Sequence, residues 1–183
     1  MYIYFMKFSR YAAIALIPLG LIACAFSTPA DTTSHARSSG QFTFGLWGDM
    51  PYEKSNDNPK IPALIKSINQ SDIAFSIYDG DIKDGSSKCS DHIYTDALKM
   101  FAQLAKPVIY VPGDNGWTDC HRLNNGGVDG LERLAHIRRV MFPTLSSLGQ
   151  HQMTLEHQGK LGEKFVENTR FTHGSVVFSN FNV

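Results

Sequence analysis

Three Gly-Asp pairs recur along the chain: Gly48-Asp49, Gly80-Asp81 and Gly113-Asp114. Each pair follows an apolar segment, and successive pairs are separated by about 30 residues, the length of one strand–helix–strand unit. The ends of parallel strands lie along one edge of a sheet, so we expect the three carboxylates to converge there. Crowded carboxylates are relieved by protonation or by a cation, and carboxylate oxygens suit hard divalent ions.

The elements that would position these pairs alternate between strand and helix. Apolar alternation predicts strands over residues 41–47, 73–78, 107–111 and 175–183. Helical spacing predicts helices over residues 60–70, 91–105 and 130–140. This order predicts an α/β fold of parallel strands with right-handed helical crossovers. Any single Gly-Asp pair would also fit an ordinary loop, so the functional argument depends on all three together.

The loops resemble the first three motifs of the calcineurin-like metallophosphoesterases. Gly48-Asp49 is similar to the start of Asp-x-His, Gly80-Asp81-Ile82-Lys83-Asp84 to Gly-Asp-x-x-Asp, and Gly113-Asp114-Asn115 to Gly-Asn-His-Glu/Asp. The resemblance covers roughly residues 42–183. It implies the N-terminal part of a layered α/β/β/α sandwich and the metal-dependent hydrolysis of phosphate esters.

The resemblance also implies a role for each motif residue. Asp49 and Asp114 would be metal ligands, and Asp81 would bridge two divalent ions of the Mn, Fe or Zn class. Asp84 would support the site as a neighbouring carboxylate. Asn115 stands at the catalytic position, where its amide would hold a phosphoryl oxygen. The implied substrate is a small phosphorylated molecule.

The chain departs from the family pattern at three positions. Pro51 and Asn115 replace histidines, and Gly116 replaces an acidic residue. Proline cannot bind a metal, and an amide cannot protonate a leaving group near neutral pH. The later His and Gly-His-x-His motifs are also missing from the sequence. We therefore expect a phosphoesterase domain over residues 41–183 that is incomplete at its C-terminus and exposes one face of its sheet.

These departures leave two functions open. The first is a hydrolase that favours activated esters such as aryl phosphates, whose leaving groups need no proton donor. The second is a non-catalytic exported lipoprotein that keeps the fold and binds an ion or a partner.

Residues close to the second and third loops are further candidates. His121 would protonate a leaving group, Arg122 would bind phosphate and Trp117 would line a substrate pocket, although each also fits a loop or packing role. Cys89 and Cys120 each follow one of these loops, which places them at the same edge of the sheet. In an exported protein this favours a disulfide between them, the alternative being two buried thiols.

The N-terminal segment predicts export. A basic lead over residues 1–10 precedes a mostly apolar stretch over 11–25, which is short for a membrane span and typical of a signal peptide. Leu21-Ile22-Ala23-Cys24 resembles a bacterial lipobox, in which Cys24 would be acylated. Secretion after ordinary cleavage and an uncleaved anchor are the alternatives. We therefore predict a signal peptide over 1–24, a flexible tether over 25–40, and a periplasmic, outer-membrane or secreted protein.

Composition excludes other classes of protein. The chain has 183 residues, of which 43% are hydrophobic and 19% are charged. These values suit one globular domain rather than a disordered chain. Lys and Arg number 17, as do Asp and Glu, so the basic excess typical of a nucleic-acid-binding protein is missing. We predict no nucleic-acid partner, and membrane association only through a lipid anchor.

Overall fold

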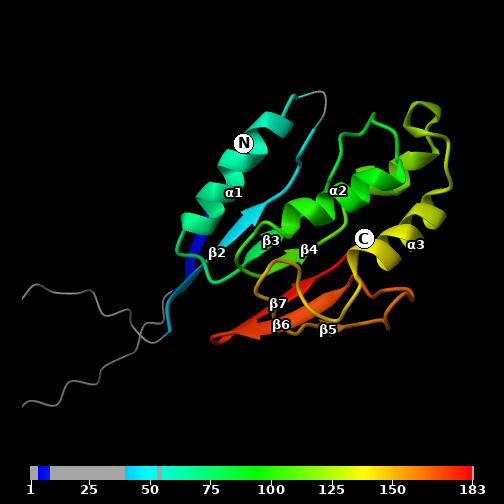
Figure 1. The fold of residues 1–183 in the computed structure, drawn as a ribbon. Coiled ribbons are helices and arrows are strands. Elements are labelled where there is room, and N and C mark those ends of the chain that lie inside the picture. The colour runs from blue at the N-terminus through cyan, green and yellow to red at the C-terminus, as the bar shows by residue number, and fades with distance from the viewer. Residues whose placement is uncertain (1–3, 9–39, 53–54, 183) are drawn as a thin grey trace, which may run out of the picture.

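The computed structural model describes residues 4–8, 40–52 and 55–182. They form a mixed α/β fold with two sheets (Figure 1). The first sheet, in the order β1-β2-β3-β4, contains Tyr4–Phe8 (β1), Phe42–Trp47 (β2), Ser76–Tyr78 (β3) and Val108–Tyr110 (β4). The second, in the order β5-β6-β7, contains Glu156–His157 (β5), Thr169–His173 (β6) and Val176–Asn180 (β7).

Helices connect the parallel strands of the first sheet. The α-helices are Ile61–Gln70 (α1), Asp91–Phe101 (α2) and Gly130–Met141 (α3). The 3₁₀ turns are Asn58–Lys60 (η1), Asp114–Gly116 (η2), Thr118–His121 (η3) and Leu123–Asn125 (η4). Strands β2, β3 and β4 are parallel, and β1 runs antiparallel to β2. The predicted α/β class and the parallel strands are therefore confirmed, with α2 ending at Phe101 rather than at Ala105.

The two faces of the first sheet pack against different layers. Successive side chains of a strand point to opposite faces. Trp47 and Tyr78 pack on the side of helices α1, α2 and α3. Phe44 and Ile109 pack on the other side, against Phe171 of β6. Figure 1 shows the three helices on one side of the first sheet and β5–β7 on the other.

The second sheet covers the face that the sequence analysis expected to be exposed. The Phe75 and Phe171 rings meet edge to face, with their centroids 5.2 Å apart. The expectation was wrong because β5 and β6 carry little apolar alternation that would reveal them. The strand predicted over 175–183 is β7, which pairs antiparallel with β6.

Strand β1 lies within the segment predicted to be a signal peptide. It pairs along the outer edge of β2, with Tyr4 opposite Leu46 and Phe8 opposite Phe42. Cys24 and nearly all of the predicted tether lie outside the described residues. Among the helices that the structure describes, none is long and apolar enough to cross a membrane.

A buried ion pair joins α3 to the second sheet. The guanidinium of Arg138 on α3 donates hydrogen bonds to both carboxylate oxygens of Glu167. Glu167 is 1% exposed and precedes β6. Removal of either partner would leave the other charge buried and uncompensated, which costs far more than the loss of an exposed pair.

This pair gives a stability prediction. Glu167→Ala should lower the free energy of unfolding by about 3–5 kcal/mol, because Arg138 then keeps a buried charge without a partner. Glu156→Ala is the matched control: it breaks an exposed pair with Arg170 and should cost about 1 kcal/mol or less. Urea denaturation measures the free energy of unfolding of both variants. Equal decreases in the two variants would contradict the prediction that the buried pair matters more than the exposed one.

Candidate functional site

The loops that follow β2, β3 and β4 are in contact with one another. The Asp49 backbone N–H donates to the Gly80 carbonyl at 3.1 Å. A Cβ on Gly80 would lie 2.9 Å from the Gly113 Cα, and a Cβ on Gly113 would lie 2.1 Å from Asp81 Oδ1. Glycine is therefore needed for close packing in the second and third loops. These contacts bring Asp49 and Asp81 to one edge of the sheet.

The first two loops share an unusual backbone turn. Asp49 and Asp81 have positive φ angles, 56° and 57°. Asp visits this left-handed region more readily than most residues, although at some energetic cost. Hydrogen bonds hold the turns: the Asp79 N–H donates to the Trp47 carbonyl at 3.0 Å, and the Tyr78 hydroxyl to the Asp81 carbonyl at 3.1 Å. Strained turns that the surrounding structure fixes in this way are frequent at functional sites.

Tyr52 and Asn115 connect the aspartates. The Tyr52 hydroxyl donates to Asp49 Oδ1 at 2.7 Å and lies 3.4 Å from Asp81 Oδ2. The backbone N–H and the side-chain amide of Asn115 donate to Asp81 at 3.1 Å and 2.7 Å, respectively. Asp114 is near enough for its charge to act on Asp81. We refer to Asp49, Asp81, Asp114 and Asn115 as the aspartate cluster.

Burial and like charges disfavour ionisation in this cluster. The pKa of Asp81 is raised to about 6, chiefly by burial and also by the charges of Asp114 and Asp49, against the lowering effect of the Asn115 N–H. Burial, followed by the Asp49 charge, also raises the pKa of Asp79. The pKa of Tyr52 lies above its ordinary value because of burial and the hydrogen bond to Asp49. Tyr52 therefore keeps its proton and remains a donor.

The side chains of the aspartate cluster are of a type that binds cations, but they are few in number. Its carboxylates are the donors that hard divalent ions prefer. Among the residues that the structure describes, no group of three or more His, Cys, Asp and Glu side chains is arranged to hold a metal ion. The Tyr52 hydroxyl and the Asn115 amide already bond to the carboxylates that such an ion would need. These hydrogen bonds would have to break before Asp49, Asp81 and Asp114 could serve an ion, and three carboxylates are too few donors for two ions.

Two further predicted site residues, Asp84 and Arg122, stabilise the loops around the cluster. Asp84 is buried, and its carboxylate accepts hydrogen bonds from the Ser86 N–H and from the hydroxyls of Ser86 and Ser87. The Arg122 guanidinium donates to Asp119 Oδ2 at 2.7 Å. Both residues therefore support the loops that follow β3 and β4.

His121 and Trp117 make their contacts outside the cluster. His121 is exposed on η3, and its Nδ1 lies 2.6 Å from the Thr118 carbonyl. Trp117 packs beside the helix-side core, and its indole N–H is buried with no hydrogen-bond partner in the described parts of the chain.

Sequence reasoning missed Tyr52 and Lys83. Lys83 is 3% exposed, and its ammonium donates to the Asn115 carbonyl at 2.8 Å. Burial lowers the pKa of Lys83. Lys83 lies inside the second motif, two residues after Asp81, and Tyr52 directly follows the first, three residues after Asp49, so their position was the available signal.

A disulfide connects the loop after β3 to η3. Cys89 and Cys120 are bonded, which confirms the predicted pairing. Asn125 reinforces the same junction, since its side-chain amide donates to the Gly85 carbonyl at 2.9 Å and its backbone carbonyl accepts from the Cys89 N–H. The second and third loops are therefore fixed relative to each other.

Two cavities border these loops. The first, of about 650 Å³, lies beside α1 and α2 and includes Ile82 and Lys83 in its wall. We refer to it as the α1–α2 pocket. The second, of about 550 Å³, is bordered by Asp49, Tyr52 and Asp79. We refer to it as the aspartate-side pocket. Both volumes are within the range of small-molecule sites.

Comparison with protein-family models, curated proteins and solved structures finds no match for the chain. Inference about function therefore depends on the loop motifs and on the geometry of the aspartate cluster.

The raised pKa of Asp81 predicts a pH dependence of stability. The folded carboxyl binds its proton more tightly than the unfolded one. The free energy of unfolding of the metal-free protein should therefore fall as the pH rises from about 4 to about 6. Asp81→Asn should remove this part of the decline. Thermal unfolding with a chelator across this pH range tests the expectation, and identical profiles for the two proteins would contradict it.

The disulfide gives a separate stability prediction. Cys89 and Cys120 are 31 residues apart, and closure of a loop of this length stabilises by about 3–4 kcal/mol in the chain-entropy model. Replacement of both residues by serine should lower the free energy of unfolding by this amount. Reduction of the wild-type protein should have the same effect, and the double variant should be insensitive to reductant. A wild-type protein equally stable with and without reductant would contradict the prediction.

Proposed function

We propose that the chain is a metal-dependent hydrolase of phosphate esters, of the calcineurin-like metallophosphoesterase type. The observation that carries the proposal is the aspartate cluster, in which residues remote in sequence meet at the ends of three parallel strands. The layered α/β/β/α sandwich of that family is part of the proposal.

Asp49, Asp81 and Asp114 are the proposed metal ligands. The family resemblance implies two divalent ions of the Mn, Fe or Zn class, whereas the cluster has only these three carboxylates to offer. A bound divalent ion supplies Lewis-acid chemistry, since it polarises the phosphoryl group and lowers the pKa of water. It would also offset the like-charge repulsion that raises the pKa of Asp81.

The chain's own residues would orient the substrate. The Asn115 side-chain amide, once released from Asp81, would donate a hydrogen bond to a phosphoryl oxygen. Lys83 would hold the loop in place through the Asn115 carbonyl. His121, Arg122 and Trp117 remain proposals for leaving-group and substrate contacts at the rim. An amide supplies no proton, so the proposed substrates are small esters with good leaving groups.

Export is part of the same proposal. The disulfide between Cys89 and Cys120 suits an oxidising compartment, such as the periplasm or the cell exterior. Acylation of Cys24 would attach the protein to a membrane, whereas simple cleavage would release it. Either cleavage would remove β1 and make β2 the edge of the first sheet.

The alternative is a non-catalytic exported lipoprotein that binds an ion or a partner. One observation favours it: the Tyr52 hydroxyl already donates a hydrogen bond to the Asp49 carboxylate. An internal donor of this kind reduces the need for a cation.

An activity assay separates the two functions. Purified protein with Mn²⁺, Zn²⁺ or Fe²⁺ should hydrolyse an aryl phosphate, and Asp81→Asn should lower kcat/KM by about 100-fold or more, because it removes the proposed bridging carboxylate. Asp72→Asn, at an exposed position before β3 and outside both pockets, is the matched control and should retain activity. Lack of metal-dependent turnover in the wild-type protein would overturn the hydrolase proposal and favour the non-catalytic alternative.

A further inference from the structure

The α1–α2 pocket begins where the second loop leaves the aspartate cluster. Ile82, directly after Asp81, lines the pocket and is 3% exposed. Pro51, between Asp49 and Tyr52 in the first loop, also lines it. A ligand in this pocket would therefore lie against the same two loops that carry the proposed metal ligands.

Part of the wall of the pocket is apolar. Ile61 of α1 and Ile93 and Met100 of α2 contribute apolar side chains, in addition to Ile82. Ile61 and Ile93 are only partly buried, although they pack against the helix-side core. These side chains leave apolar surface that a ligand ring would remove from water, which favours binding.

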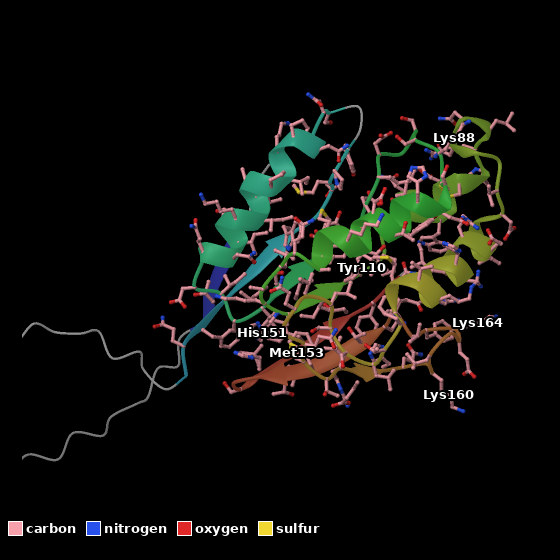
Figure 2. The ribbon with its side chains drawn as sticks, viewed as in Figure 1. Lys88, Tyr110, His151, Met153, Lys160 and Lys164 are labelled. Carbon is pink, nitrogen blue, oxygen red and sulfur yellow. A yellow bond between two sulfur atoms is a disulfide. The ribbon has the colours of Figure 1, made fainter. Side chains whose placement is uncertain are left out.

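Charge distinguishes the α1–α2 pocket from the aspartate-side pocket. Lys83, Lys88 and His92 line the α1–α2 pocket, and Figure 2 shows Lys88 on the loop that leads into α2. Of the acids in this lining, Asp84 accepts several hydrogen bonds, and Asp96 pairs with Lys99 at 2.8 Å.

The aspartate-side pocket is more acidic, whereas two lysines and two aspartates line the α1–α2 pocket. Three carboxylates line the aspartate-side pocket, those of Asp49, Asp57 and Asp79, with Lys60 paired to Asp57. Without a bound cation, a negatively charged ester would be repelled there. The α1–α2 pocket is therefore the more favourable place for the organic part of such a substrate.

We propose that the α1–α2 pocket binds the aromatic ring of an aryl phosphate monoester and that Ile93 is a specificity-determining wall. This inference rests on the proposed function and adds the place where the aryl group of the substrate binds. In the reaction, water oxygen bonds to phosphorus as the bond from phosphorus to the aryl oxygen breaks. The phenolate leaves with the electron pair and takes a proton from solvent, so the products are phenol and inorganic phosphate.

Binding, measured apart from turnover, tests the pocket. Calorimetry on the purified, Mn²⁺-treated protein would compare phenyl phosphate with inorganic phosphate, under conditions too brief for appreciable hydrolysis. Burial of the ring should make phenyl phosphate bind about tenfold more tightly. Ile93→Trp, which narrows the pocket, should remove this preference. Thr95→Trp, on the exposed surface of α2 outside the pocket, should retain it.

The possible outcomes distinguish a failure of the pocket assignment from a failure of the hydrolase proposal. Equal binding of the two ligands by the wild-type protein, or a preference that survives in Ile93→Trp, would overturn the pocket assignment. A preference that Ile93→Trp removes, in a protein that never hydrolyses phenyl phosphate, would support the pocket and overturn the hydrolase proposal. Thermal unfolding verifies that each variant is folded, and Ile93→Ala, which widens the pocket, should weaken the preference without overpacking the core.

Discussion

The close approach of three strand ends is the constraint on which the rest of the structure depends. Gly80 and Gly113 are in backbone contact, so a side chain at either position would force two loops apart. The same contact brings Asp81 against Gly113, where the charges of Asp49 and Asp114 act on it. Glycine at these positions therefore does more than interrupt a strand. It sets the distance at which the neighbouring acidic side chains interact.

Crowding of carboxylates must be compensated, and in this chain several polar groups share the task. Tyr52 donates a hydrogen bond to Asp49, and Asn115 donates one to Asp81. Lys83 in turn donates a hydrogen bond to the backbone carbonyl of Asn115. The disulfide between Cys89 and Cys120 then prevents the second and third loops from separating under their mutual repulsion. A cation would strengthen an arrangement that the protein already supports through hydrogen bonds. Such preorganisation is the usual requirement of a binding or catalytic site.

Sequence periodicity predicted the parts of the fold whose pattern is strong. The disulfide follows from the expected position of Cys89 and Cys120 at one edge of the sheet, and the three parallel strands follow from local signals along the chain. The second sheet does not, because β5 has only two residues and β6 buries polar Thr169 beside apolar Phe171. The role of Tyr52 could not be predicted either, since its contact with two aspartates depends on the turn at Asp49 and on the neighbouring loop.

Asn115 in place of a histidine determines what the proposed chemistry can accomplish. A general acid is worth about 10²–10⁴ in rate, and no hydrogen bond from an amide replaces the proton it would deliver. Apolar binding improves affinity, yet binding shared equally by substrate and transition state does not raise kcat. The missing proton donor must therefore be compensated by the substrate, whose leaving group must be an alcohol acidic enough to depart as an anion. Phenols meet this requirement, and their rings suit an apolar wall beside the cluster. The residue at position 115 and the shape of the α1–α2 pocket thus favour the same class of ester.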